Sequence, residues 1–218
     1  RVSRIITVST NLRDILSDRY GSERVTYIPH GIDVTAFRPG MLDVEEMRQA
    51  MLNDRFEQMA LMVGVHGVKH GMLKGLVRAH PQVLFVIVGK PMPDSDLQNI
   101  TYVQNITEEE LIRLYEAADI FFRPLRFATA NNALLEAMAM GKPVLMTRSG
   151  ALDIDIEDLG IGLWIKPKDS QDWVAKIDYL TTHPRVAHGM GKRAHSLATS
   201  FYNSSRFERD VVRFLESI

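Results

Sequence analysis

The sequence contains no cysteine, and this absence removes several kinds of chemistry from consideration. Disulfide bonds and thiolate nucleophiles are excluded, and a chain without cysteine fits a reducing compartment. No apolar stretch reaches the roughly 18 residues that a membrane-spanning helix needs. Charge of one sign is not in excess either, because 26 basic residues stand against 27 acidic ones. The composition therefore gives no electrostatic argument for nucleic-acid binding.

Hydrophobic residues make up 45% of the 218 residues, which is enough for the core of about one large domain. Short apolar runs without a polar face alternate with amphipathic stretches, a pattern typical of a parallel sheet covered by helices. The expected strands of this sheet are residues 60–65, 83–89, 100–103, 119–122, 144–146 and 162–165. Thr107 followed by Glu110 predicts a capping box at the start of one helix. This order predicts an α/β fold built on a doubly wound, Rossmann-like parallel sheet.

Ligands of doubly wound sheets bind beyond the carboxyl ends of the strands, where the strand order reverses. Gly64 and Gly89 follow the first two core strands, and we expect both to line such a site. The segment between these strands has the order of a βαβ unit. Its glycines fall at positions 64, 67 and 71, which does not match the Gly-x-Gly-x-x-Gly fingerprint of dinucleotide-binding enzymes. A nicotinamide-dependent enzyme is therefore disfavoured.

One acid stands on an otherwise apolar helix in the stretch 128–144. Asn131 or Asn132 is a suitable N-cap for this helix, and Glu136 interrupts its apolar surface. An acid on a largely buried helix needs a partner. Glu136 is then either a structural carboxylate near a helix start or an acceptor for the hydroxyls of a bound ribose.

The backbone at the start of the same helix offers a second binding feature. Helix N-termini present free amides to anions, and the helix dipole adds to the attraction. We expect the amides of Asn132, Ala133 and Leu134 to face a phosphate if the ribose interpretation of Glu136 holds.

The run LLEAMAMGKPV at residues 134–144 resembles the signature of GT-B fold glycosyltransferases of family 4, also called glycosyl transferases group 1. The resemblance implies transfer of a sugar from a nucleotide-sugar with retention of configuration. It also implies that Glu136 binds the donor ribose, as the second acid of a two-acid motif. The first acid would fall at Ala128, and the Thr-Ala-Asn-Asn run at 129–132 resembles a variant form of the family.

A donor diphosphate needs cations, because bond cleavage adds negative charge to the leaving group. The resemblance implies an arginine and a lysine at two positions that are Val65 and His70 in this chain. Lys69 is the nearest substitute, and we expect Lys69 or His70 to act as the catalytic cation. Weaker candidates are His66, Lys74, Arg123 and Arg126. The alternative is that this segment is an ordinary solvated loop.

The same resemblance divides the chain into three parts. Residues 1–35 correspond to the tail of an N-terminal domain and the interdomain connection, residues 36–200 to the nucleotide-sugar-binding domain, and residues 201–218 to a C-terminal crossover helix. The expected packing face of that helix comprises Phe201, Phe207, Val211 and Phe214. Asp153 follows Gly150 in a loop that resembles the sugar-contacting loop of the family. The acceptor site would lie on the missing domain, so we expect the isolated chain to be inactive.

The expected partners are a nucleotide-sugar and a glycan or lipid acceptor, as in polysaccharide biosynthesis, with no cofactor, no metal and no nucleic acid. We expect a cytoplasmic, hexosyltransferase-like enzyme, with peripheral attachment to the inner face of the membrane through the missing domain. Two alternatives stay open. One is a binding or scaffold module that keeps the fold without catalysis, and the other is a sugar-nucleotide epimerase on the same GT-B architecture.

Overall fold

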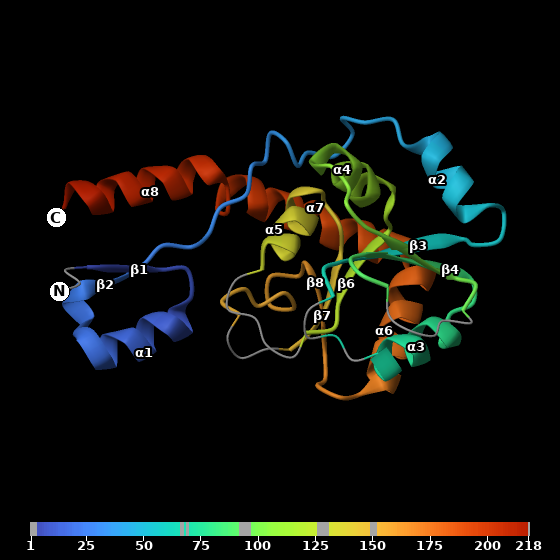
Figure 1. Cartoon of the computed structure of the whole chain (residues 1–218), viewed down its shortest axis with the longest axis horizontal. Helices are drawn as coiled ribbons and strands as arrows, with labels where there is room; N and C mark the ends of the chain where they lie inside the picture. Colours follow the sequence, from blue (N-terminus) through green and yellow to red (C-terminus); the bar gives the residue numbers. More distant parts are fainter. Residues whose placement is uncertain are drawn as a thin grey trace.

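The computed structural model describes residues 4–65, 68, 70–91, 97–125, 131–148 and 152–217. The described residues form a small two-stranded sheet and a six-stranded sheet, joined by an extended segment (Figure 1). Strands β1 (Ile5–Thr7) and β2 (Val25–Tyr27) make the small sheet, and α1 (Thr10–Tyr20) and the 3-10 turn η1 (Ser22–Arg24) connect them. No described helix is long and apolar enough to cross a bilayer.

The six-stranded sheet is parallel throughout and has the order β5-β4-β3-β6-β7-β8. Its strands are β3 (Gln58–Val63), β4 (Val83–Val88), β5 (Ile100–Val103), β6 (Ile120–Arg123), β7 (Val144–Thr147) and β8 (Gly162–Ile165). The chain adds strands outward from β3 in one direction and outward from β6 in the other. The prediction of a doubly wound sheet is therefore confirmed, and its switch point lies between β3 and β6.

Helices cover both faces of this sheet (Figure 1). They are α2 (Glu45–Leu52), α3 (His70–Ala79), α4 (Glu108–Ala117), α5 (Asn132–Ala139), α6 (Ser170–Thr182) and α7 (Pro184–Ser200). Successive residues of a strand point to opposite faces. Met59 and Leu61 of β3 accordingly join the core under α4 and α5, while Ala60 and Met62 join the core under α3 and α6. Burial on both faces explains why these strands are continuously apolar.

The last helix, α8 (Ser204–Glu216), extends from the main domain toward the small sheet (Figure 1). The connecting segment crosses its start: the Ile32 amide donates to the Tyr202 carbonyl at 2.7 Å, and the Ser204 amide donates to the Ile32 carbonyl at 2.9 Å. The backbones approach so closely that a Cβ on Gly31 would lie 2.8 Å from the Asn203 carbonyl oxygen. This crossing ties the small sheet to the C-terminal helix.

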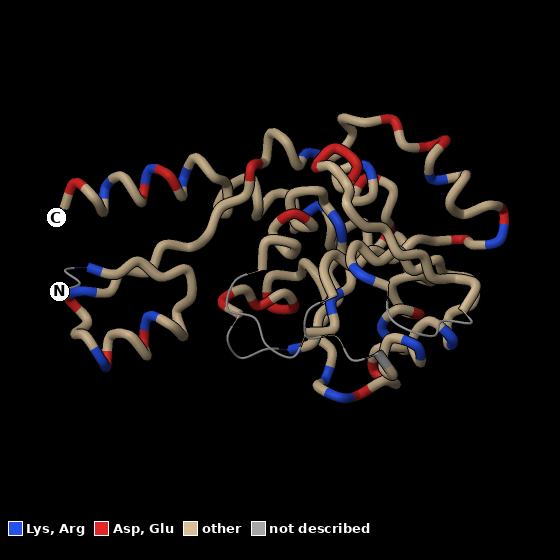
Figure 2. The backbone as a smooth tube through the Cα atoms, in the orientation of Figure 1, with Lys and Arg blue, Asp and Glu red and all other residues tan. Residues whose placement is uncertain are grey.

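The packing face expected for the last helix is correct in part. Phe214 is buried, Val211 is half-buried, and the Phe207 ring lies 5.5 Å from the His30 ring. Phe201 is different, because it is 45% exposed and lies beneath the guanidinium of Arg206 at 4.8 Å. The prediction for Phe201 was wrong because this residue precedes the helix, so it does not share the face of the other three. Figure 2 shows basic and acidic residues mixed along α8 and α1, in keeping with a net charge of −1.

Candidate functional site

The carboxyl ends of β3 and β6 meet at the switch point, and each contributes one unusual residue. Gly64 follows β3 directly and has a φ of +79°, a conformation that other residues rarely adopt. Arg123 is the last residue of β6. The α5 helix begins shortly after β6 in the chain and carries the family-like signature. The switch point is where ligands of such sheets bind.

Arg123 bridges the switch point from one strand to the other. Its Nη1 donates to the Gly64 carbonyl, although 59 residues separate the two in sequence. The residue is only 9% exposed, and its Nε has no acceptor within the described part of the chain. A Cβ on Gly64 would lie 2.8 Å from Nη1, so the close approach requires glycine. Burial lowers the pKa of the Arg123 guanidinium, which means that the surroundings only partly replace water around its charge.

Glu136 is half-buried on α5 and is held by a tyrosine from α4. The hydroxyl of Tyr115 donates to Glu136 Oε2 at 2.8 Å and also lies 3.1 Å from the Ala133 carbonyl. Tyr115 itself is completely buried. Burial raises the pKa of the Glu136 carboxyl above its usual value, while the Tyr115 hydrogen bond and the positive charge of Arg123 oppose that rise. A carboxylate has room for several donors, and this one has a single described partner.

The start of α5 is capped by an asparagine, as the sequence suggested, and the cap uses one of the amides expected to be free. Asn131 is the N-cap, and its Oδ1 accepts from the Leu134 amide at 3.2 Å. The prediction of a free Leu134 amide was therefore wrong, because the cap already uses that donor. Within the described residues, the amides of Asn132 and Ala133 have no acceptor, since the first amides of a helix lack an intrahelical partner.

The remaining predicted residues lie in different places. Gly89 follows β4, and a Cβ there would lie 2.8 Å from Val65 Cγ1, so Val65 packs tightly against this turn. His70 is the first residue of α3, and its side chain is outside the described part of the structure. Lys69 and Ala128 are outside the described residues as well. The expected catalytic role of Lys69 or His70 therefore stays a prediction.

Asp153 joins the main domain to the small sheet. Its carboxylate accepts from the Thr10 amide at 2.9 and 3.1 Å and from the Thr10 hydroxyl. Thr10 is the first residue of α1, so Asp153 satisfies donors at a helix start. A pocket beside this contact is lined by residues that include Tyr27, His30 and Asn131. The start of α5 thus faces the cleft between the two sheets.

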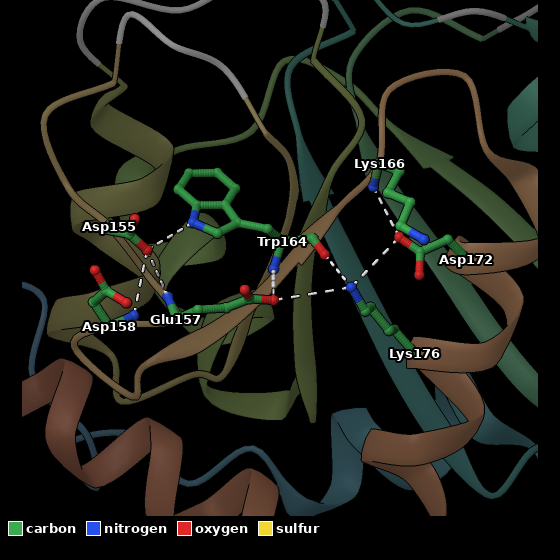
Figure 3. A network of polar contacts seen from close by, with 7 residues as sticks. All are labelled: Asp155, Glu157, Asp158, Trp164, Lys166, Asp172 and Lys176. Carbon is green, nitrogen blue, oxygen red and sulfur yellow. Dashed lines mark hydrogen bonds and ion pairs between the residues drawn. The ribbon is translucent and has the colours of Figure 1, made fainter.

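A second polar cluster lies over β8, the edge strand of the large sheet (Figure 3). The Trp164 amide donates to Glu157 Oε1 at 2.8 Å, and the Trp164 carbonyl accepts from Lys176 Nζ. The indole Nε1 of Trp164 donates to Asp155 Oδ1 at 2.8 Å. Lys176 Nζ also lies 3.4 Å from Asp172 and 3.9 Å from Glu157. Side chains therefore form the hydrogen bonds to β8 backbone groups on the side where no further strand pairs with it.

The acids of this second cluster have further partners. Asp155 Oδ1 also accepts from the amides of Glu157 at 3.2 Å and Asp158 at 3.3 Å. The hydrogen bond from Trp164 is the main reason that the pKa of the Asp155 carboxyl is lowered. Asp172 Oδ2 accepts from the Lys166 amide at 2.8 Å. The carboxylates of Asp155, Glu157 and Asp172 and the ammonium of Lys176 therefore each have at least two partners.

Two contacts at the switch point were not expected from the sequence. Tyr115 was not singled out from the sequence, although a buried tyrosine hydroxyl needs a partner and so gave a signal. Arg123 was a weak candidate for phosphate binding, and its bond to Gly64 was not foreseen. The sequence did carry a signal for Arg123, because this charged residue ends the otherwise apolar strand Ile-Phe-Phe-Arg.

Known proteins resemble this chain in sequence and in structure. D-inositol 3-phosphate glycosyltransferase of Segniliparus rotundus is 25% identical over 199 residues, which cover 82% of this chain and 44% of that protein. Sulfoquinovosyl transferase SQD2 of Arabidopsis thaliana is 28% identical over 176 residues, which cover 75% of this chain and 34% of that protein. The chain therefore spans less than half the length of these two relatives.

A solved structure shows the same fold over almost the whole chain. The crystal structure of Anabaena HepE in complex with UDP-glucose superposes with a TM-score of 0.80 at 18% identity, covering 99% of this chain and 64% of HepE. Residues 64–183, more than half of the chain, match the family model described as Glycosyl transferases group 1. The chain belongs to this family, and its fold is that of the C-terminal domain of a GT-B glycosyltransferase.

Proposed function

We propose that this domain binds the nucleotide-sugar donor of a glycosyltransferase at the switch point between β3 and β6. The observation that carries the proposal is the position of Glu136. Its half-buried carboxylate lies on α5 and has Tyr115 as its single described hydrogen-bond partner. A carboxylate with spare acceptor capacity suits the two hydroxyls of a ribose.

Each part of the site has a role in this proposal. Glu136 accepts hydrogen bonds from the ribose, and the amides of Asn132 and Ala133 face a phosphate oxygen. Gly64 and Gly89 line the strand ends beside the nucleotide, and Lys69 or His70 supplies charge near the departing diphosphate. The sugar then passes to the acceptor with retention of configuration, as proposed from the family resemblance.

The relatives support a transfer reaction without fixing its substrates. One relative is named as a D-inositol 3-phosphate glycosyltransferase and another as a sulfoquinovosyl transferase, and HepE was solved with UDP-glucose. We propose a nucleoside diphosphate hexose as the donor and a glycan or lipid as the acceptor. In the proposal, the acceptor site lies on a second domain, the chain alone transfers no sugar, and the enzyme works in the cytoplasm at the membrane surface.

Calorimetric titration with UDP, GDP and ADP tests the donor site directly. We expect saturable binding of one of them, and Glu136→Ala should weaken it by about a hundredfold, because two hydrogen bonds to a charged group contribute about 1.5 kcal/mol or more each. Glu208→Ala, which changes an exposed glutamate on α8, is the matched control and should bind like the wild type. Equal affinity of the wild type and Glu136→Ala would refute the proposed role of Glu136.

A donor-binding module without catalysis is the second candidate. Val65 favours it, because this residue packs its side chain against Gly89 where the resemblance implies an arginine. A longer protein that contains this domain and binds the nucleotide but neither hydrolyses nor transfers the sugar would support this candidate. Product analysis with a labelled nucleotide-sugar would also reveal an epimerase, because an epimerised donor differs from a transferred or hydrolysed sugar.

A further inference from the structure

We propose that Arg123 supplies the positive charge that binds the donor diphosphate, in place of the cation that is absent at position 65. This inference rests on the proposed donor function and adds a specific residue to it. The charge would then come from the end of β6, across the switch point from the loop that follows β3.

The charge of Arg123 has no anionic partner in the described structure. The residue is 9% exposed, and no described carboxylate lies within ion-pair distance of its guanidinium. Other partly buried arginines are paired: Arg48 lies 2.8 Å from Asp119, and Arg206 lies 2.9 Å from Asp210. A buried charge without a counter-charge is unfavourable. An anionic ligand at this position would provide the missing counter-charge.

The guanidinium of Arg123 also keeps unused hydrogen-bond capacity. Nη1 donates to the Gly64 carbonyl, which fixes the orientation of the side chain. Nε is buried without an acceptor in the described residues. Arginine carries five N–H donors in a planar fork that matches the oxygens of a phosphate. The contact to Gly64 therefore holds the fork in place and leaves donors for a ligand.

Arg123 also lies close enough to Glu136 for the two charges to interact. The two charges influence each other electrostatically, yet Glu136 is held by Tyr115 and forms no ion pair with Arg123. Ribose and diphosphate are adjacent groups on one nucleotide. The carboxylate of Glu136 and the guanidinium of Arg123 are near each other but not paired, so they match the two parts of such a ligand. Glu136 would bind the ribose hydroxyls, and Arg123 would bind the phosphate oxygens.

A purely structural role for Arg123 is the alternative, because its bond to Gly64 also ties β3 to β6. Arg123→Gln removes the charge and also the bond to the Gly64 carbonyl, because the glutamine amide stands two bonds short of the Nη1 position. The two roles are separated by the ligand, since a ligand contact lowers diphosphate affinity alone, whereas a structural role lowers diphosphate and nucleoside affinity together. The readout is the ratio of affinities for a nucleoside diphosphate and its uncharged nucleoside, measured as UDP with uridine, GDP with guanosine and ADP with adenosine. The control is Arg113→Gln, which removes a surface arginine paired with Glu109 on α4.

We expect Arg123→Gln to lower the diphosphate affinity on the order of tenfold or more, the effect of one charge-assisted hydrogen bond, and to leave nucleoside affinity unchanged. The salt dependence of diphosphate binding should also weaken. Unchanged diphosphate affinity, or an equal loss for both ligands, would overturn the inference. If Arg123→Gln does not fold, Arg123→Met decides by the same ratio, because methionine keeps most of the apolar length of the side chain and removes the charge; an unchanged ratio there would overturn the inference.

The outcomes also separate this inference from the proposed function. Binding that is lost in Glu136→Ala and kept in Arg123→Gln would refute only the role of Arg123. A folded wild-type chain that binds none of the three diphosphates would refute both.

Discussion

The two polar clusters of this domain differ in how completely their charges are paired. Over β8, Asp155, Glu157 and Lys176 each contact the backbone or side chain of Trp164, and Asp172 lies beside Lys176 (Figure 3). At the switch point, Arg123 donates to one carbonyl and Glu136 accepts from one hydroxyl. Several partners for each charge stabilise the fold, whereas unused donors and acceptors indicate where a ligand binds.

The difference also has a physical consequence for stability. Charges that are partly buried without full pairing destabilise the folded state, and functional sites commonly retain such groups. The raised pKa of Glu136 shows this cost at the switch point, while the lowered pKa of Asp155 shows the opposite balance over β8. Substitutions in the two clusters should therefore change binding and stability in different combinations.

Among substitutions in the two clusters, we expect Gly64→Ala at the switch point to lower the stability most. The positive φ and the 2.8 Å approach of a new Cβ to Arg123 Nη1 both oppose the substitution. We expect a loss of about 2 kcal/mol or more in the free energy of unfolding, from backbone strain and the displaced guanidinium together. Chemical denaturation measures it. Gly71→Ala on α3, where a Cβ would meet nothing within 4 Å, is the control and should be as stable as the wild type or more so.

Tyr115→Phe should break the support of Glu136 without removing the acid. A buried acceptor that loses its donor costs about 1–3 kcal/mol, so the free energy of unfolding should fall by that amount. The pKa of Glu136 should rise further, because the Tyr115 hydrogen bond lowers it in the wild type. Titration followed by NMR of the Glu136 carboxyl measures the shift. An unchanged pKa would show that the hydroxyl is not the partner of the carboxylate.

Trp164→Phe should affect the paired cluster alone. The substitution removes the indole donor to Asp155 and leaves the backbone bonds to Glu157 and Lys176 in place. We expect a loss of about 1–2 kcal/mol in stability, with nucleotide affinity unchanged within error. A matching loss of affinity would mean that the two clusters are not independent.

We expect the smallest effect in how stability and nucleotide affinity depend on pH through Glu136. Burial raises the pKa of Glu136 above its ordinary value of 4.5, so its contribution to stability is present below that value and is lost as the pH rises through the folded pKa. Glu136→Gln should accordingly be more stable than the wild type at neutral pH, and this advantage should vanish in acid. Nucleotide affinity of the wild type should fall as the carboxylate becomes protonated. Thermal melts and titrations across the pH range check both trends.

Local sequence signals predicted much of the fold. Continuous apolar runs predicted the parallel strands, Thr107 and Glu110 form the predicted capping box, and Asn131 caps α5 as one of the two residues suggested. These features depend on a few neighbouring residues. The free Leu134 amide was wrongly predicted because the cap that the sequence suggested consumes that same donor.

The contacts of the site join residues that are far apart in sequence, and local sequence patterns cannot predict such pairs. Tyr115 and Glu136 are 21 residues apart on different helices, and Gly64 and Arg123 are 59 residues apart on strands that become neighbours only when β6 pairs with β3. The sequence predicted the position of Glu136 and the edge of the sheet at which ligands bind. Neither partner could be predicted without the strand order.

One experiment separates a donor site at Glu136 from a purely structural carboxylate. The best-binding nucleoside diphosphate is titrated into the wild type, Glu136→Gln and Trp164→Phe at pH 7, and the stability of each is measured in parallel. We expect Glu136→Gln to lose affinity and gain stability, and Trp164→Phe to keep affinity and lose stability. Affinity that is kept in Glu136→Gln, or lost equally in both variants, would contradict the account.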